Sequence, residues 1–325
     1  MKPALAWCLA SLLKGLLVWS LLVSQPALAI MAGAANANPP DRPEWRVDPN
    51  LTTSPWAGVG SLSVKGGTYS AVAIGPQHVL TAAHVVSGSL PADIVFNLNY
   101  GGDLNFKIHA SATRVHPGYG KNQVGGVQLD DIAVITLATP LPPGVPHYAL
   151  LNQPLEIGAT IILVGYGASG DGTNGVTQAG HPAVKRTGRN VIDLFQPAVK
   201  RFELPRAYLF DFDDPMSQIS QLGGPSLGND IETMIASGDS GSPAFISIDG
   251  EWQIAGINTF QINSSARGAT VTRFGALGGG MWLPAYHQWV AASMQPRPAP
   301  ETQSGYLWMA GLAGLFGVSR LRLWR

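Results

Sequence analysis

The sequence contains almost no cysteine and little charge. Its only cysteine among 325 residues is Cys8, close to the start of the chain. Intramolecular disulfide bonds are therefore excluded, and the fold must rely on a buried apolar core, which a chain of this length can supply. Basic and acidic residues number 20 each. A nucleic-acid-binding surface is not indicated, since such surfaces carry an excess of positive charge.

Signals for long helices are also scarce. Charged residues make up only 12% of the chain, while it contains 39 glycines and 25 prolines. This composition favours many short strands joined by turns. A single helix is predicted at residues 284–294, where Tyr286, Trp289, Val290 and Met294 recur at helical spacing. Strands followed by one terminal helix predict an all-β protein built from closed antiparallel barrels. The predicted strands cover residues 56–64, 70–75, 78–83, 93–100, 131–137, 160–167, 242–248 and 252–260.

The first residues are typical of a signal peptide that directs export. Lys2 precedes a mostly apolar run, which ends at the cleavage pattern Ala27-Leu28-Ala29. A second candidate pattern is Ala35-Asn36-Ala37, and we assign residues 1–37 to the signal region. The alternative is a retained membrane anchor. After cleavage the mature domain, residues 38–295, contains no cysteine.

The C-terminal residues predict a membrane-directed tail. Residues 296–304 form a proline-rich linker, and residues 305–319 are uncharged and mostly apolar. Arg320, Arg322 and Arg325 follow, and such a cluster favours the cytoplasmic side of a membrane. The tail, residues 305–325, resembles the bacterial PEP-CTERM sorting signals, although "PAPET" stands where Pro-Glu-Pro is expected. This resemblance implies contact with a membrane or a sorting enzyme; the alternative is a helix packed on the domain.

Three short segments carry the residue types of a nucleophilic site. Ser240 lies in "IASGDSGSPAF", which could equally be an ordinary glycine-rich turn. A serine hydroxyl needs a base, and the base needs an orienting acid. His84 ends the apolar run "VLTAAH" and is the candidate base. Asp131 enters the apolar run of "LDDIAVITL" and is favoured over Asp130 as the candidate acid; a solvated turn residue is the alternative role for Asp130.

In the order His, Asp, Ser, these segments resemble the three signatures of the chymotrypsin/trypsin family of serine endopeptidases. The resemblance covers roughly residues 55–295 and implies two antiparallel Greek-key β-barrels, with the active site between them and a helix at the C-terminal end. It also implies that Ser240 is the nucleophile, His84 the general base and Asp131 its orienting acid. The backbone N–H groups of Gly238 and Ser240 would form the oxyanion hole.

The sequence departs from the family pattern next to the nucleophile. Ala236 stands where a cysteine is usual, and Ser242 replaces a glycine; because both residues at that position are small, we expect activity to survive. In family members activated by cleavage, the residue at Asp239 pairs with a freed N-terminal ammonium. Here we expect Arg46 or a new N-terminus near it to pair with Asp239. A mature chain that begins at Ile30 would count against the freed-amine version.

The resemblance places Met234, Thr259, Phe260 and Gln261 at the substrate-binding site. None of these residues is acidic. The specificity for Lys or Arg that an acidic residue confers is therefore not expected, and we predict an uncharged P1 side chain, small or apolar.

The expected function is that of an exported serine endopeptidase acting on polypeptides through an acyl-enzyme, without a cofactor or a metal. The alternative is a catalytically silent binding or surface protein that keeps the fold. Asp211, Asp213 and Asp214 in "FDFDDP" are expected to form a solvated turn, with a calcium loop as the alternative.

Overall fold

The computed structural model describes residues 30–196, 204–217, 220–224, 226–263 and 272–296. The calls on the signal sequence before Ile30 and on the C-terminal tail lie outside these residues, and nearly all of the linker does too. None of the helices within the described ranges is long and apolar enough to cross a membrane.

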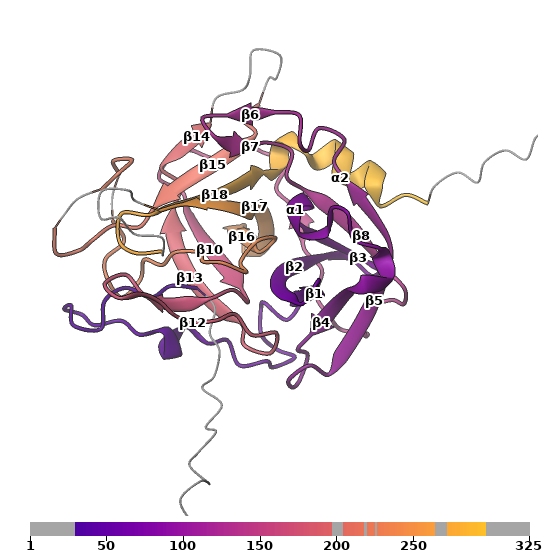
Figure 1. Ribbon diagram of the computed structural model, residues 1–325, viewed down its shortest axis with the longest axis horizontal. Coiled ribbons are helices and arrows are strands. Elements are labelled where there is room, and N and C mark those ends of the chain that lie inside the picture. Colours follow the sequence, from indigo (N-terminus) through magenta and orange to yellow (C-terminus); the bar gives the residue numbers. More distant parts are fainter. Residues whose placement is uncertain (1–29, 197–203, 218–219, 225, 264–271, 297–325) are drawn as a thin grey trace, which may run out of the picture.

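The first half of the chain forms a closed antiparallel barrel (Figure 1). Its strands follow the order β1-β2-β3-β8-β5-β4. Side chains such as Leu62, Phe96 and Ile135 point inward and are fully buried, because alternate residues of a strand face the same side of the sheet. The strands are β1 (Val59–Val64), β2 (Gly67–Gly75), β3 (His78–Thr81), β4 (Ile94–Leu98), β5 (Phe106–Val115) and β8 (Ala133–Leu137).

The second half forms an eight-stranded sheet that curves into a half-barrel. Seven strands follow the order β13-β10-β16-β17-β18-β15-β14, and the short β9 pairs with β17 in parallel. Within the described ranges this sheet is not closed, which distinguishes it from the first barrel. Its strands are β9 (Ala149–Leu150), β10 (Thr160–Gly165), β13 (Arg186–Val191), β14 (Leu194–Gln196), β15 (Ala207–Asp211), β16 (Pro243–Ile248), β17 (Glu251–Ile262) and β18 (Leu277–Trp282).

Two hairpins and a few short helices complete the fold. The hairpins pair β6 (Gln123–Val124) with β7 (Val127–Gln128), and β11 (Ser169–Asp171) with β12 (Gly175–Gln178). The helix expected at 284–294 is present as the 3-10 turn Leu283–Ala285 followed by α2 (His287–Ser293). The other short helices are α1 (Ala83–Val86) and the 3-10 turns Pro43–Arg46 and Pro91–Asp93.

An apolar layer joins the two halves. Val72 and Leu80 of the first barrel belong to the same buried cluster as Phe245 and Ile257 of the second sheet. Burial of this surface, at about 25 cal/mol per Å² of apolar area, holds the halves together without disulfide bonds. The predicted all-β class, with two barrel-type antiparallel sheets and a C-terminal helix, is confirmed.

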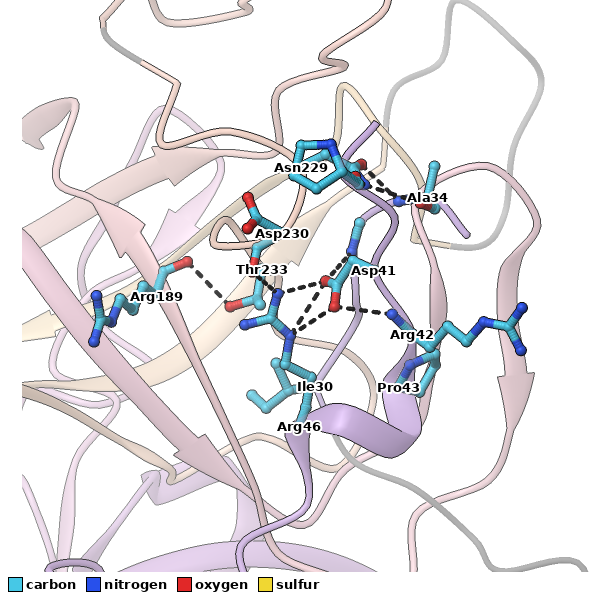
Figure 2. Close-up of polar contacts among 12 residues, drawn as sticks. Ile30, Ala34, Asp41, Arg42, Pro43, Arg46, Arg189, Asn229, Asp230 and Thr233 are labelled. Carbon is cyan, nitrogen blue, oxygen red and sulfur yellow. Dashed lines mark hydrogen bonds and ion pairs between the residues drawn. The ribbon is translucent and has the colours of Figure 1, made fainter. Parts of the chain in front are cut away.

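Residues 30–34, which precede the expected start of the domain at residue 38, are buried in this structure. Ile30 and Met31 are fully buried, and Met31 exchanges backbone hydrogen bonds with Met234 at 2.8 and 3.3 Å. Farther along, the side chain of Asn229 holds both the N–H and the carbonyl group of Ala34, at 2.7 and 2.9 Å (Figure 2). Residues 30–34 therefore pack as part of the second half, and the boundary expected after residue 37 stays a prediction.

Candidate active site

His84, Asp131 and Ser240 converge from three separate elements. His84 lies on α1, directly after β3; Asp131 precedes β8; and Ser240 precedes β16. Nε2 of His84 lies 2.8 Å from Oγ of Ser240. Because His84 and Asp131 belong to the first barrel and Ser240 to the second sheet, the hydrogen-bonded chain of three side chains crosses between the two halves.

Asp131 orients the His84 imidazole through two contacts. One carboxylate oxygen lies 2.7 Å from Nδ1 of His84, and the other accepts the backbone N–H of His84 at 2.8 Å. The Asp131 side chain is only 6% exposed, whereas the His84 side chain is 33% exposed. The acid is thus shielded from water, while the imidazole edge that faces Ser240 stays open to an incoming molecule.

The loop around Ser240 adopts a backbone that requires glycine at two positions. Gly238 and Gly241 have φ values of +95° and +84°, in the left-handed region that side chains disfavour. A Cβ atom on Gly241 would lie 2.1 Å from Oγ1 of Thr81, so the loop packs directly against the first barrel. The N–H of Ser70 donates to the carbonyl of Ser240 at 3.0 Å, which fixes the nucleophile's backbone to β2.

Two backbone donors beside Ser240 are available for an anion. Within the described residues, the N–H groups of Gly238 and Ser240 make no hydrogen bond to the fold, while the intervening Asp239 N–H donates to Ala236 at 2.9 Å. The arrangement places a hydroxyl next to an imidazole and leaves two free donors nearby. Chemically, it can activate the hydroxyl for attack on a carbonyl and stabilise the oxyanion that forms.

Asp239 is a fully buried carboxylate beneath this loop. It accepts the N–H of Gly167 and that of Ala236, each at 2.9 Å. A third donor is the backbone N–H of Ile30. Burial raises the pKa of Asp239 to about 7, and the three backbone donors and the nearby charge of Arg186 only partly oppose this rise.

Arg46 does not pair with Asp239, so that part of the expectation is wrong. Its guanidinium instead binds Asp41 in a bidentate contact, with Nη2 at 2.5 Å, and donates to the carbonyl of Asp230 at 2.6 Å (Figure 2). The backbone nitrogen that reaches Asp239 is that of Ile30. A mature chain beginning at Ile30 would therefore favour the freed-amine version, contrary to our expectation from the sequence.

The four residues expected at the substrate site occupy different environments. Met234 is fully buried and packs against Phe210 in the core of the second sheet, so it does not line an open pocket. Thr259, on β17, is 9% exposed, and its hydroxyl is buried without a partner among the described residues. Phe260 and Gln261, also on β17, are half-buried. These last three residues follow Asn258, whose carbonyl accepts the N–H of Gly241 at 2.8 Å.

The "FDFDDP" segment is not the solvated turn that we expected. Asp211 and Asp213 are 3% and 9% exposed. Burial, with the neighbouring charges of Asp211 and Glu232, raises the pKa of Asp213 to about 7. Across the described ranges, no three acidic, histidine or cysteine side chains are arranged to hold a metal ion.

Asp130 is fully buried, so the alternative of a solvated turn residue is excluded for it. Its partners Arg206 and Tyr286 lie far along the chain, so no local pattern indicates the contact. The two adjacent aspartates that precede the apolar strand were the available signal that both carboxylates are buried, since buried carboxylates require partners.

Comparisons with known proteins agree with this architecture. The family model described as Trypsin matches residues 48–199, a range that includes His84 and Asp131 but ends before Ser240. Among solved structures, the chain is similar to neuropsin, a serine protease expressed in the limbic system of mouse brain. The two share 19% identity with a TM-score of 0.52, and the match covers 77% of this chain and 98% of neuropsin. Among curated proteins there is no match.

Proposed function

We propose that this chain, whose fold and family match support a serine-type peptidase of the chymotrypsin/trypsin-like family, is an endopeptidase with the triad His84, Asp131 and Ser240. The observation that carries the proposal is the unbroken contact from Asp131 through His84 to Ser240, at 2.7 and 2.8 Å. A catalytically silent protein would leave this chain of contacts without a chemical role.

The mechanism follows from these contacts. Ser240 Oγ attacks the carbonyl carbon of a peptide bond as Nε2 of His84 takes its proton. Asp131 keeps the other ring nitrogen protonated and stabilises the imidazolium. The N–H groups of Gly238 and Ser240 bind the oxyanion, and the loss of one such donor typically costs about 10²–10³ in rate. His84 then protonates the leaving amine, and water hydrolyses the acyl-enzyme by the reverse sequence.

Casein hydrolysis tests this proposal. The chain beginning at Ile30 should cleave casein into peptides, and both Ser240→Ala and His84→Ala should abolish cleavage while keeping the same thermal unfolding curve. Cleavage that survives in Ser240→Ala would contradict the assignment of the nucleophile. A folded wild-type chain without activity would favour the silent binding protein.

We further propose that removal of the leader after Ala29 completes the active site. The cut would replace the amide N–H of Ile30 by an ammonium beside the buried Asp239 carboxylate. Ile30 also has a φ of +59°, where a β-branched side chain is strained by the preceding peptide group. Cleavage removes that peptide group, so it would relieve strain and supply a counter-charge in one step.

Export and membrane attachment are proposals that rest on the sequence alone. The leader and the C-terminal tail, residues 305–325, would place the domain outside the cytoplasm, with the tail directed to a membrane or a sorting enzyme. Fractionation of cells that express the full chain and a chain ending at residue 304 tests the tail. Equal recovery of both forms in the soluble fraction would refute attachment.

A further inference from the structure

Asp130 is a buried aspartate that directly precedes Asp131 in the sequence, and the proposed mechanism does not use it. Asp130 is fully buried, and its partner Tyr286 is only 1% exposed. An ionised carboxylate in such a place is costly unless charged or hydrogen-bonding groups surround it. The groups around Asp130 therefore indicate what the residue does.

Each oxygen of the Asp130 carboxylate is held. Oδ2 accepts the side-chain amide of Asn122 at 2.7 Å, and Oδ1 accepts the Tyr286 hydroxyl at 3.1 Å and forms an ion pair with Arg206. His116 lies 3.8 Å from Oδ1. Gly118 approaches so closely that a Cβ there would lie 2.1 Å from Oδ2, so no larger residue fits beside the carboxylate as it is placed.

The backbone of Asp130 also closes a tight turn around Asp131. Asp130 has a φ of +64°, in the left-handed region, and its carbonyl accepts the N–H of Ile132 at 2.9 Å. Its N–H donates to the Tyr286 hydroxyl at 3.2 Å. Asp131 is thus the central residue of a three-residue turn, whose first residue is fixed through both its side chain and its main chain.

The groups that hold Asp130 come from both halves of the molecule. Asn122 belongs to the first half, whereas Arg206 directly precedes β15 of the second sheet and Tyr286 directly precedes α2. The Arg206 guanidinium also lies 4.8 Å from the centre of the Tyr286 ring and donates to its hydroxyl at 3.2 Å. Through Asp130, Arg206 and Tyr286 therefore connect the backbone next to Asp131 to the half that carries Ser240.

We propose that Asp130 is a positioning residue: it sets the direction of the Asp131 carboxylate toward His84 and fixes that direction relative to the second half. This inference rests on the proposed serine-peptidase function. Small displacements of a catalytic group are expensive, since a shift of about 1 Å can cost about 100-fold in rate. An aspartate that only stabilised the fold would leave the rate of each folded molecule unchanged.

Burst kinetics with p-nitrophenyl acetate separate these roles in the chain from Ile30 to Arg325. The burst amplitude counts competent active sites, and the burst rate reports acylation of Ser240. Asp130→Asn should lower the burst rate about tenfold or more at an amplitude matching the folded fraction. Tyr286→Phe removes a single hydroxyl and should lower the rate about threefold, which decides the question if Asp130→Asn does not fold.

Asp48→Asn is the matched control, because the Asp48 side chain is only 9% exposed and forms an ion pair with the buried Lys185 at 3.1 Å. It should lower the melting temperature yet keep the burst rate within about twofold of wild type. Burst rates within twofold of wild type in Asp130→Asn, or in Tyr286→Phe if the former does not fold, would overturn the inference. A wild-type chain without a burst and without fluorophosphonate labelling would instead overturn the proposed function, and this inference with it.

Discussion

The proposed ion pair between a freed Ile30 amine and Asp239 can be tested by comparing two proteins that begin at different residues. One protein begins at Ile30, and its matched control begins at Ala29 and is longer by that single residue. Both keep every side chain of the domain. Only the first has an ammonium at the nitrogen that contacts Asp239; the second has an amide N–H there.

The expected magnitude follows from the burial of Asp239. Burial raises the pKa of Asp239 from near 4 to about 7. Ionisation of this carboxyl group is therefore about 4 kcal/mol less favourable in the folded protein than in water. An ammonium at about 4 Å returns about 4 kcal/mol at an effective dielectric constant of about 20. The freed amine would thus offset the burial cost. Because about 1.4 kcal/mol is tenfold, transmission of even a third of this energy to the Ser240 loop changes reactivity about tenfold.

The assay is the rate of fluorophosphonate labelling, combined with thermal unfolding at pH 5 and pH 7.5. The Ile30 form should label at least about tenfold faster at pH 7.5. In the Ala29 form the raised pKa of Asp239 means that the folded state holds its proton more tightly than the unfolded state does. Its stability should therefore fall as the pH rises from about 4 to about 7, whereas the Ile30 form keeps its ion pair until the amine deprotonates above about pH 8. Identical labelling rates and pH profiles in the two forms would show that the Ile30 amine does not pair with Asp239.

Three further predictions concern the site and its support. Asp131→Asn should lower kcat about 10⁴-fold with a near-normal KM, measured by steady-state casein or ester hydrolysis, because the wrong imidazole tautomer would face Ser240; a loss below tenfold would contradict this role. Gly241→Ala should unfold the domain or leave no labelling, because its Cβ would lie 2.1 Å from Oγ1 of Thr81 at a φ of +84°; normal melting and labelling would show that the loop has room. Peptide-library profiling should return small or apolar P1 residues, since Thr259, Phe260 and Gln261 carry no charge, and a preference for Lys or Arg would overturn this expectation.

The sequence was sufficient to predict the fold class and the three residues that converge. The strands have alternating apolar patterns, and the segments around His84, Asp131 and Ser240 are short, local and in a fixed order. The degree of closure of the second sheet was not predictable, because it depends on pairings between distant strands such as β14 and β15.

Contacts with residues outside the local segment account for the errors. Ile30 contacts Asp239, and Asp130 contacts Tyr286, and the two residues of each pair lie far apart in the sequence. Asp211 and Asp213 lie in a turn-like sequence, and yet they are buried because the chain folds back over them: Asp211 accepts the N–H groups of Gln221 and Leu222, at 2.5 and 2.8 Å. In each case the local residues favour a solvated turn or a linker, and tertiary packing decides otherwise.

Activation of Ser240 by His84 and Asp131 can be measured by intact mass after treatment with a fluorophosphonate, followed by peptide mapping of the labelled residue. We expect one label per chain on Ser240, and none in either Ser240→Ala or His84→Ala. A folded chain beginning at Ile30 that takes no label, or that carries the label on another residue, would contradict this activation.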